Sequence, residues 1–405
     1  MSKKNRKQKW IKFRHKVITF LAYYPMFIYT RLAYGIKIKR YKDKQKRPYI
    51  ILLNHQTPLD QFFVGLSFKR PIYYMATEDI FSLGWVSKLI KYLIAPIPIK
   101  KQTTDARAVL NLMRVVSEGG SVCIAPEGNR TYSGKTEYIN PTIAGLIKKL
   151  KLPVAFFKIE GGYGVEPRWS DVKRKGKMVG YVSKVLEPSE YENLSANDIY
   201  DLIVKETFVD ETKIIGEFKH KKRAEYLERC VYVCPKCGLS EFHSNGAFVT
   251  CKKCGLQAEY TVDKEFKGVD CEFPFKTVND WYEYQKSFIN KLDIDKFYDA
   301  PAYIDQATVK LVIPYKKKES LYDSAEIKLY GDKIIFISNE NSLALDFDSV
   351  SAISVLGRNK LNVYHGDKIY QVKGDKRFNA LKYVNFYFRY KNVKKGDENE
   401  QFLGL

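Results

Sequence analysis

A histidine and an aspartate flank the turn that follows an apolar run in the first part of the chain. The run at residues 49–53 predicts a buried strand, and the residues after it predict a helix. Thr57 suits the N-cap and Pro58 the first helical position, because the N–H that proline lacks would have no partner there. Asp60 could then hold a proton on one ring nitrogen of His55 and leave the other nitrogen free to act as a base. In the alternative interpretation, Asp60 only complements the helix dipole and His55 is an ordinary loop residue.

A second buried strand is predicted at residues 119–125, and a glycine-kinked loop with polar side chains follows it. This loop contains the run Pro126-Glu127-Gly128-Asn129-Arg130. Its carboxylate, amide and guanidinium suit an acceptor that carries both a hydroxyl and a phosphate, because the planar guanidinium matches phosphate geometry. Open α/β sheets bind ligands at the carboxyl ends of their strands. The loop is therefore a candidate binding site for such an acceptor.

The ordered pair N-H-x-x-x-x-D and P-E-G-x-R, each after an apolar strand, resembles the motifs of the glycerophospholipid acyltransferase family. The best-known members of that family are the 1-acylglycerol-3-phosphate acyltransferases, and the resemblance covers roughly residues 15–215. It implies that His55 is the general base on the acceptor hydroxyl and that Asp60 is its partner. It also implies that the acceptor phosphate is bound by Glu127, Gly128, Asn129 and Arg130.

Two further blocks depart from the family pattern. Where the family usually has an arginine, this chain has Lys100 and Lys101, which keep the positive charge but lose the bidentate geometry. Phe156 stands where a second proline is common. The resemblance makes the two lysines candidate acceptor-binding residues, and it leaves the acceptor head group open.

Helical and strand patterns alternate through the first half of the chain. Residues 105–116 have the apolar spacing of an amphipathic helix, residues 143–150 predict another helix, and residues 154–159 form another apolar strand. Alternation of this kind predicts an α/β fold with a mostly parallel or mixed sheet flanked by helices. The acyltransferase domain is expected at residues 48–217.

The N-terminal segment is basic and amphipathic. The first 16 residues contain eight Lys or Arg and no acidic residue, and Pro25 interrupts the apolar run 17–29 that follows. The run is shorter than the roughly 20 apolar residues that cross a bilayer. Residues 1–47 are therefore expected to lie in the cytoplasmic leaflet as a peripheral or monotopic arm, with core packing and a true span as alternatives. The net charge of +23 favours a polyanionic partner such as an anionic membrane surface.

Two C-x-x-C-G motifs follow in the segment 218–262, which is expected to contain a charged linker helix and a zinc ribbon. Thirteen residues separate the two inner cysteines, a spacing typical of a structural zinc site with four thiolate ligands. Two redox dithiols or a pair of disulfides are the alternatives, and thiolates kept for a metal imply a reducing, cytosolic side. The candidate ligands are Cys234, Cys237, Cys251 and Cys254.

Beyond a linker at residues 263–302, the hydrophobic period changes to two. Gly331-Asp332 and Gly366-Asp367 are typical of hairpin turns, and a final helix is predicted from about residue 376 to 390. Residues 303–405 therefore predict a β-rich domain closed by a helix, which resembles a pleckstrin-homology-like barrel. Such a domain could bind a lipid head group or serve only in assembly.

The sequence as a whole predicts a membrane-associated O-acyltransferase. It would move an acyl group from acyl-CoA or acyl-carrier protein to a lysophospholipid, and 1-acylglycerol-3-phosphate as acceptor would give phosphatidic acid. One alternative is a different lysolipid or a glycolipid acceptor. Another is a non-catalytic membrane scaffold with a degenerate core, which would recruit proteins through the ribbon or the C-terminal domain. Nucleic-acid binding is a further interpretation of the basic charge, and the acyltransferase motifs argue against it.

Overall fold

The structure is a computed structural model that describes residues 9–43, 45–99, 106–313, 318–339, 341–396 and 402–404. The chain divides into two compact units, and each unit is made of segments that are distant in sequence. The first unit contains Met1–Gly128, Ile139–Glu160 and Met178–Val209, and the second contains Asn129–Tyr138, Gly161–Lys177 and Asp210–Leu405.

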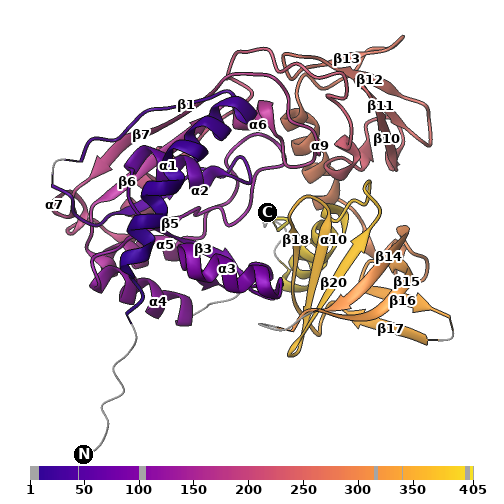
Figure 1. Cartoon of the computed structure of the whole chain (residues 1–405). Coiled ribbons are helices and arrows are strands. Elements are labelled where there is room, and N and C mark those ends of the chain that lie inside the picture. Colours follow the sequence, from indigo (N-terminus) through magenta and orange to yellow (C-terminus); the bar gives the residue numbers. More distant parts are fainter. Residues whose placement is uncertain are drawn as a thin grey trace, which may run out of the picture. The chain divides into compact units, whose positions relative to one another are not determined.

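The first unit is built on a mixed sheet of seven strands (Figure 1). In order across the sheet they are β1 (Ile36–Ile38), β7 (Met178–Leu186), β6 (Val154–Glu160), β2 (Ile50–Leu53), β5 (Ser121–Ile124), β3 (Ile72–Thr77) and β4 (Ile97–Ile99). β2 is parallel to β5 and β6, whereas β6 and β7 are antiparallel. All four residues of β2 are buried, as expected for a strand that has helices on both faces. The prediction of a mixed α/β sheet is confirmed.

Helices cover both faces of this sheet. On one face, Ile50 and Leu52 of β2 pack in an apolar cluster with residues of α4 (Ala106–Ser117), α5 (Thr142–Leu150) and α8 (Ala196–Thr207). α1 (Phe13–Tyr34) and α2 (Asp60–Phe68) pack together on the opposite face, where the Tyr34 and Phe63 rings meet edge to face. The remaining elements are η1 (Glu78–Ser82), α3 (Trp85–Ile94) and α7 (Pro188–Tyr191). Among the described helices, none combines the length and hydropathy needed to cross a membrane.

The four cysteines of the C-x-x-C-G motifs lie in the second unit, among two small sheets. A two-stranded sheet pairs β8 with β9, and a four-stranded antiparallel sheet follows in the order β10-β11-β12-β13. The bounds are α6 (Gly162–Val165), η2 (Leu227–Arg229), β8 (Val233–Cys234), β9 (Gly238–Leu239), β10 (Phe242–Asn245), β11 (Phe248–Cys251), β12 (Gln257–Tyr260), β13 (Phe266–Gly268), α9 (Val278–Asn290) and η3 (Ile294–Phe297).

The C-terminal part of the second unit is an antiparallel sheet of seven strands, in the order β17-β16-β15-β14-β20-β19-β18. The bounds are β14 (Tyr303–Leu311), β15 (Glu319–Leu329), β16 (Lys333–Ser338), β17 (Asn341–Asp346), β18 (Val350–Leu356), β19 (Lys360–His365), β20 (Lys368–Gly374) and α10 (Leu381–Lys395). The predicted hairpins at Gly331-Asp332 and Gly366-Asp367 join β15 to β16 and β19 to β20. The β-rich half closed by a helix is confirmed, and its pleckstrin-homology-like character stays a prediction.

Two element predictions in this unit are wrong. The final helix begins at Leu381, because Asn379 accepts the N–H of Lys382 and Asp375 accepts the N–H of Arg377 in a turn before it. The charged stretch 218–229 is not a solvated linker helix, since it contains only the short η2 turn and its Arg229 is buried. A charge-rich sequence looks solvated when its ionic partners lie far away in the chain.

Candidate active site

The first sheet brings the two sequence motifs to the same edge. β2 and β5 are parallel neighbours, with Leu52 opposite Ile124, so their carboxyl ends lie side by side. His55 follows β2 and Glu127 follows β5. The backbone N–H of His55 donates a hydrogen bond of 2.9 Å to Glu127 Oε1. Residues 72 positions apart in the chain therefore meet at the carboxyl ends of two adjacent strands.

The carboxylate of Asp60 organises the turn and the histidine ring together. Its Oδ2 lies 2.8 Å from His55 Nδ1 and accepts the backbone N–H of Gln56 at 2.6 Å. The N–H of Thr57 donates to both oxygens at 2.9 Å, and its hydroxyl donates to Oδ1 at 2.6 Å. The aspartate is fully buried, whereas the His55 side chain is 26% exposed. A carboxylate on Nδ1 fixes the ring orientation and leaves Nε2 as the nitrogen that can take a proton.

The same network explains why the helix starts later than predicted. α2 begins at Asp60 with Leu59 as its N-cap, so the prediction of Thr57 as N-cap and Pro58 as first helical residue is wrong. The hydroxyl of Thr57 donates to the Asp60 carboxylate, and that carboxylate caps the N–H groups of the preceding turn. A role limited to complementing the helix dipole does not account for the bond between Asp60 and the ring.

The loop after β5 carries the other predicted site residues. Gly128 turns the chain there with a φ of +65°, a conformation that glycine adopts at little cost, and its N–H donates to the carbonyl of Ala125 at 2.9 Å. Glu127 and Asn129 are buried, and Arg130 is half-buried. The division between the two units falls after Gly128, so Asn129 and Arg130 belong to the second unit.

Two supporting residues were not singled out from the sequence. Asn54, directly before His55, exchanges two hydrogen bonds of 2.8 Å with the backbone of Ile159 in β6 and so anchors the start of the turn. Asn54 could have been found from the sequence, because it is the first residue of the N-H-x-x-x-x-D motif. Arg168 donates to the carbonyl oxygen of Arg130 at 2.8 Å, and no motif marks it. The two predicted lysines, Lys100 and Lys101, lie outside the described residues.

The four predicted cysteines come together in the second unit. Their sulfurs lie within 4.8 Å of one another, and Sγ–Sγ separations of 3.6 Å join Cys234 to Cys254 and Cys237 to Cys251. A tetrahedral zinc ion with Zn–S bonds of about 2.3 Å separates its sulfurs by about 3.8 Å. A disulfide would require about 2.05 Å, so the arrangement fits four ligands around one metal ion. Such a metal would have no open position for chemistry.

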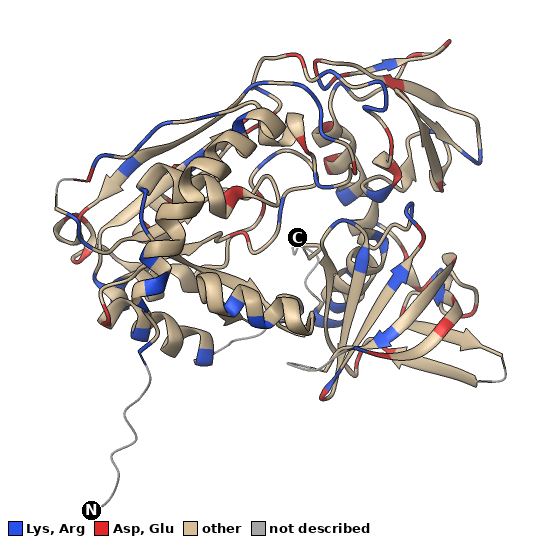
Figure 2. Ribbon diagram, in the orientation of Figure 1, with Lys and Arg blue, Asp and Glu red and all other residues tan. Residues whose placement is uncertain are grey.

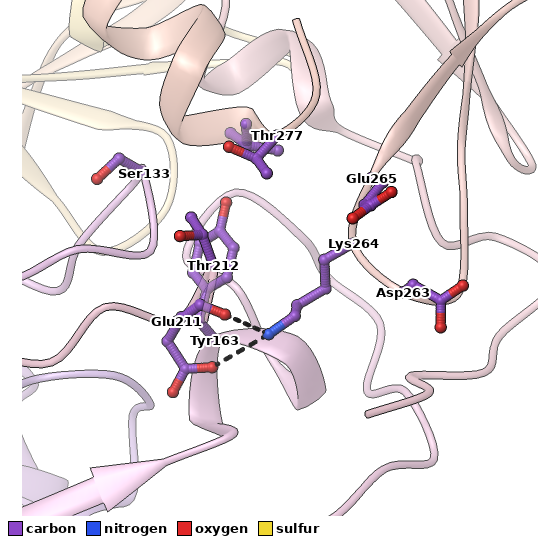
Figure 3. Close-up of a pocket in the computed structure, with 9 residues that line it drawn as sticks. Ser133, Tyr163, Glu211, Thr212, Asp263, Lys264, Glu265 and Thr277 are labelled. Carbon is purple, nitrogen blue, oxygen red and sulfur yellow. Dashed lines mark hydrogen bonds and ion pairs between the residues drawn. The ribbon is translucent and has the colours of Figure 1, made fainter. Parts of the chain in front are cut away.

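A buried ion pair in the second unit is structural. Lys264 Nζ lies 3.7 Å from Glu211 Oε2 and donates to the carbonyl oxygens of Glu211 and Ile214. Burial lowers the pKa of Lys264, and the Glu211 carboxylate opposes that shift. Figure 3 shows the lysine reaching across a small hollow to Glu211. The cation is held by carbonyl and carboxylate oxygens, so the pair ties the Glu211 segment to the turn between β12 and β13.

Comparisons with known proteins agree with the motif assignment. Residues 35–155 match the family model described as Acyltransferase. A curated 1-acyl-sn-glycerol-3-phosphate acyltransferase of Saccharomyces cerevisiae is 26% identical over 196 residues, which are 46% of this chain and 62% of the yeast protein. The chain thus matches less than two thirds of that relative's length.

Two solved structures are also similar in part. The 1-acyl-sn-glycerophosphate acyltransferase PlsC of Thermotoga maritima is 17% identical with a TM-score of 0.36, over 47% of this chain and 76% of that one. The N-terminal PH domain of human ARAP2 is 15% identical with a TM-score of 0.19, over 22% of this chain and 81% of that one. The two motifs, the family model over residues 35–155 and the yeast relative all indicate similarity to the acyltransferase family.

Proposed function

We propose that the protein transfers a fatty acyl group from a thioester, acyl-CoA or acyl-carrier protein, to the hydroxyl of a lysophospholipid. The proposed acceptor is 1-acylglycerol-3-phosphate, and the product is phosphatidic acid. The single observation that carries this proposal is the His55 ring, oriented through Nδ1 by the buried Asp60 at the carboxyl edge of β2 and β5. The acceptor assignment is supported by the name of the yeast relative and by the Glu127–Arg130 motif.

The chemistry follows from the geometry of the histidine. Nε2 of His55 removes the acceptor hydroxyl proton as the oxygen forms a bond to the thioester carbonyl carbon, while Asp60 stabilises the imidazolium. When the carbon–sulfur bond breaks, the imidazolium returns the proton to the thiolate. A positioned base of this kind accelerates the reaction by about 10²- to 10⁴-fold. Arg130 is assigned to the acceptor phosphate, because a guanidinium binds phosphate through two parallel hydrogen bonds.

The acceptor is tested by comparing head groups. Purified protein in detergent micelles is given labelled acyl-CoA with 1-acylglycerol-3-phosphate, lysophosphatidylcholine or monoacylglycerol, and the products are identified by mass spectrometry. We expect phosphatidic acid as the main product, with loss of the preference for the phosphate acceptor in Arg130→Gln. Equal transfer to all three acceptors would contradict both the role of Arg130 in binding phosphate and the choice of 1-acylglycerol-3-phosphate as acceptor.

We further propose that the first unit binds an anionic membrane surface through α1 and α3. Large apolar side chains are exposed on both helices. On these two helices they include Phe13, Phe20, Leu21, Tyr24, Ile28, Leu32, Trp85, Leu89 and Tyr92.

The two helices are joined and are free of acidic residues. Arg14 of α1 donates to the carbonyl oxygen of Tyr92 in α3 at 3.0 Å, and its guanidinium lies 4.2 Å from the centre of that ring. Figure 2 shows Lys and Arg positions on both helices and no Asp or Glu position on either. Exposed apolar area with basic residues beside it suits insertion into the interface of an anionic bilayer. We propose that this surface faces the cytoplasm, because thiolates kept for a metal imply a reducing compartment.

Vesicle flotation tests this surface. Burying a large apolar side chain contributes about 1.5–3 kcal/mol, so Phe20→Asp with Trp85→Asp should weaken binding to phosphatidylglycerol vesicles by about 100-fold or more. Ile215→Asp, at an exposed apolar residue of the second unit, is the matched control and should bind as the unaltered protein does. Equal flotation of all three proteins would contradict the assignment of α1 and α3.

A further inference from the structure

The second half of the acceptor motif is held by the C-terminal sheet. Asn129 and Arg130 belong to the same compact unit as β18 and β19, although more than half of the chain separates them in sequence. The turn that joins these two strands contains Gly357 and Arg358, and Gly357 has a φ of +63°. Backbone oxygens of this turn and of the end of β18 are the acceptors through which the motif is attached to the sheet.

Arg168 makes the attachment with one buried guanidinium. Its Nη1 donates to the carbonyl oxygen of Arg130 at 2.8 Å, and its Nη2 lies 3.4 Å from Asn129 Oδ1. The other bonds go to the C-terminal sheet, from Nη2 to the carbonyl oxygen of Val355 at 3.1 Å and from Nε to that of Gly357 at 2.9 Å. The side chain is 2% exposed, so these bonds are shielded from water.

Tyr132 adds a second, parallel attachment. Its hydroxyl donates to the carbonyl oxygen of Arg358 at 2.7 Å, and the Arg168 guanidinium lies 4.4 Å from the centre of its ring. The Arg358 side chain in turn forms an ion pair with Glu166, two residues before Arg168. The Arg168 segment and the β18–β19 turn therefore hold each other, and the loop with Asn129 and Arg130 cannot shift without breaking several buried hydrogen bonds.

We propose that Arg168 is a positioning residue that sets the place of Arg130 by bridging its backbone to the β18–β19 turn, so that acceptor binding depends on the C-terminal sheet. This inference rests on the proposed function, because it assigns the phosphate of the acceptor to Arg130. It gives the C-terminal domain a part in the recognition of phosphate-bearing acceptors. A lysine at position 168 would keep the charge but could not make the four bonds at once.

The first test is the kinetics of two matched variants in the full-length protein. Arg168→Lys should raise the KM for 1-acylglycerol-3-phosphate by about 10-fold or more, because several hydrogen bonds are lost. The KM for acyl-CoA should stay within about twofold, because the loop is assigned to the acceptor alone. Arg174→Lys is the control, since Arg174 is equally buried and donates to the carbonyl oxygens of Gly164 and Arg223 without touching the motif. It should leave both KM values unchanged, and equal KM values in all three proteins would overturn the proposal.

The second test does not depend on activity. Amide hydrogen exchange of residues 129–133 should be faster in Arg168→Lys and in the milder Tyr132→Phe than in the unaltered protein, and Arg174→Lys should leave it unchanged. Unchanged exchange in Arg168→Lys would overturn the positioning role even if the protein transfers no acyl group. If exchange is faster in Arg168→Lys but the unaltered protein transfers no acyl group, the positioning role of Arg168 stands and the proposed function is rejected.

Discussion

Replacing Asp60 with asparagine separates the two roles that the structure gives to this carboxylate. Asparagine has nearly the same shape but offers one acceptor oxygen and one donor nitrogen, and it carries no charge. If the amide nitrogen faces His55 Nδ1, it donates to the ring and forces the proton onto Nε2, which can then no longer act as a base. If it faces Thr57 instead, the ring keeps its hydrogen bond but loses the charge that stabilises the imidazolium. Both orientations lower the rate.

The magnitudes follow from the hydrogen bonds of Asp60. Loss of an effective base lowers kcat by about 10² to 10⁴. The carboxylate also accepts the N–H of Gln56 and the N–H and hydroxyl of Thr57. Hydrogen bonds to a charged acceptor contribute about 1 kcal/mol more than neutral ones, and the amide nitrogen leaves a donor of the turn without an acceptor, so Asp60→Asn should cost about 3 kcal/mol of unfolding free energy or more. His55→Ala removes only the ring from a partly exposed position and should leave stability within about 1 kcal/mol of the original.

The assay combines acyl-transfer kinetics with urea unfolding of the single variants and of the double variant. The rate of the double variant should equal that of His55→Ala, because Asp60 acts on the reaction through the ring. The unfolding midpoint should fall only in the two proteins that carry Asp60→Asn. If Asp60→Asn is less stable but keeps its kcat, the carboxylate only caps the turn and the base assignment is wrong. A further drop in rate in the double variant would also refute the coupling.

Three other predictions concern the second unit. Elemental analysis should find one zinc ion per chain. Cys251→Ser or a chelator should release the ion and lower the unfolding temperature. A metal-free protein of full stability would contradict the assignment of the four cysteines as ligands. Lys264→Met should destabilise the protein by about 3–5 kcal/mol in urea unfolding, because it removes the cation that faces the buried carboxylate of Glu211, and a neutral effect would show that the pair is dispensable. Gly164→Ala places a Cβ 2.3 Å from the Phe218 ring and should cost about 1–3 kcal/mol by the same measurement; no loss would mean that the ring can move aside.

The sequence predicts those parts of the site that local patterns define. The run at β2 is apolar throughout and the run at β5 is apolar after Ser121, so the strands and the polar residues at their ends could be read directly, and two parallel neighbours place His55 beside Glu127. The cysteine spacing likewise defines its own cluster. A local pattern could not locate the start of α2, because the Asp60 carboxylate caps the preceding turn instead of leaving Thr57 to cap the helix.

Contacts between distant segments were beyond the reach of the sequence. Arg229 was placed in a solvated stretch, yet it is buried and forms two hydrogen bonds of 2.7 and 3.0 Å with Asp171, 58 positions earlier. Arg168 lacked any motif because its role depends on carbonyl oxygens of β18 and of the turn after it, nearly 190 positions later. Backbone acceptors carry no signature in the sequence, so only the fold reveals such partners.

The acyl-transfer activity of the purified, detergent-solubilised protein tests the central claim most directly. Labelled acyl-CoA and acyl-carrier protein are offered with 1-acylglycerol-3-phosphate to the unaltered protein, to His55→Ala and to a control, His243→Ala, at an exposed histidine of β10. We expect the unaltered protein and the control to transfer the acyl group from at least one donor. In His55→Ala the rate of transfer should fall by about 10²- to 10⁴-fold. Full activity in His55→Ala, or no transfer by a folded, zinc-loaded protein, would contradict the account and favour a non-catalytic scaffold.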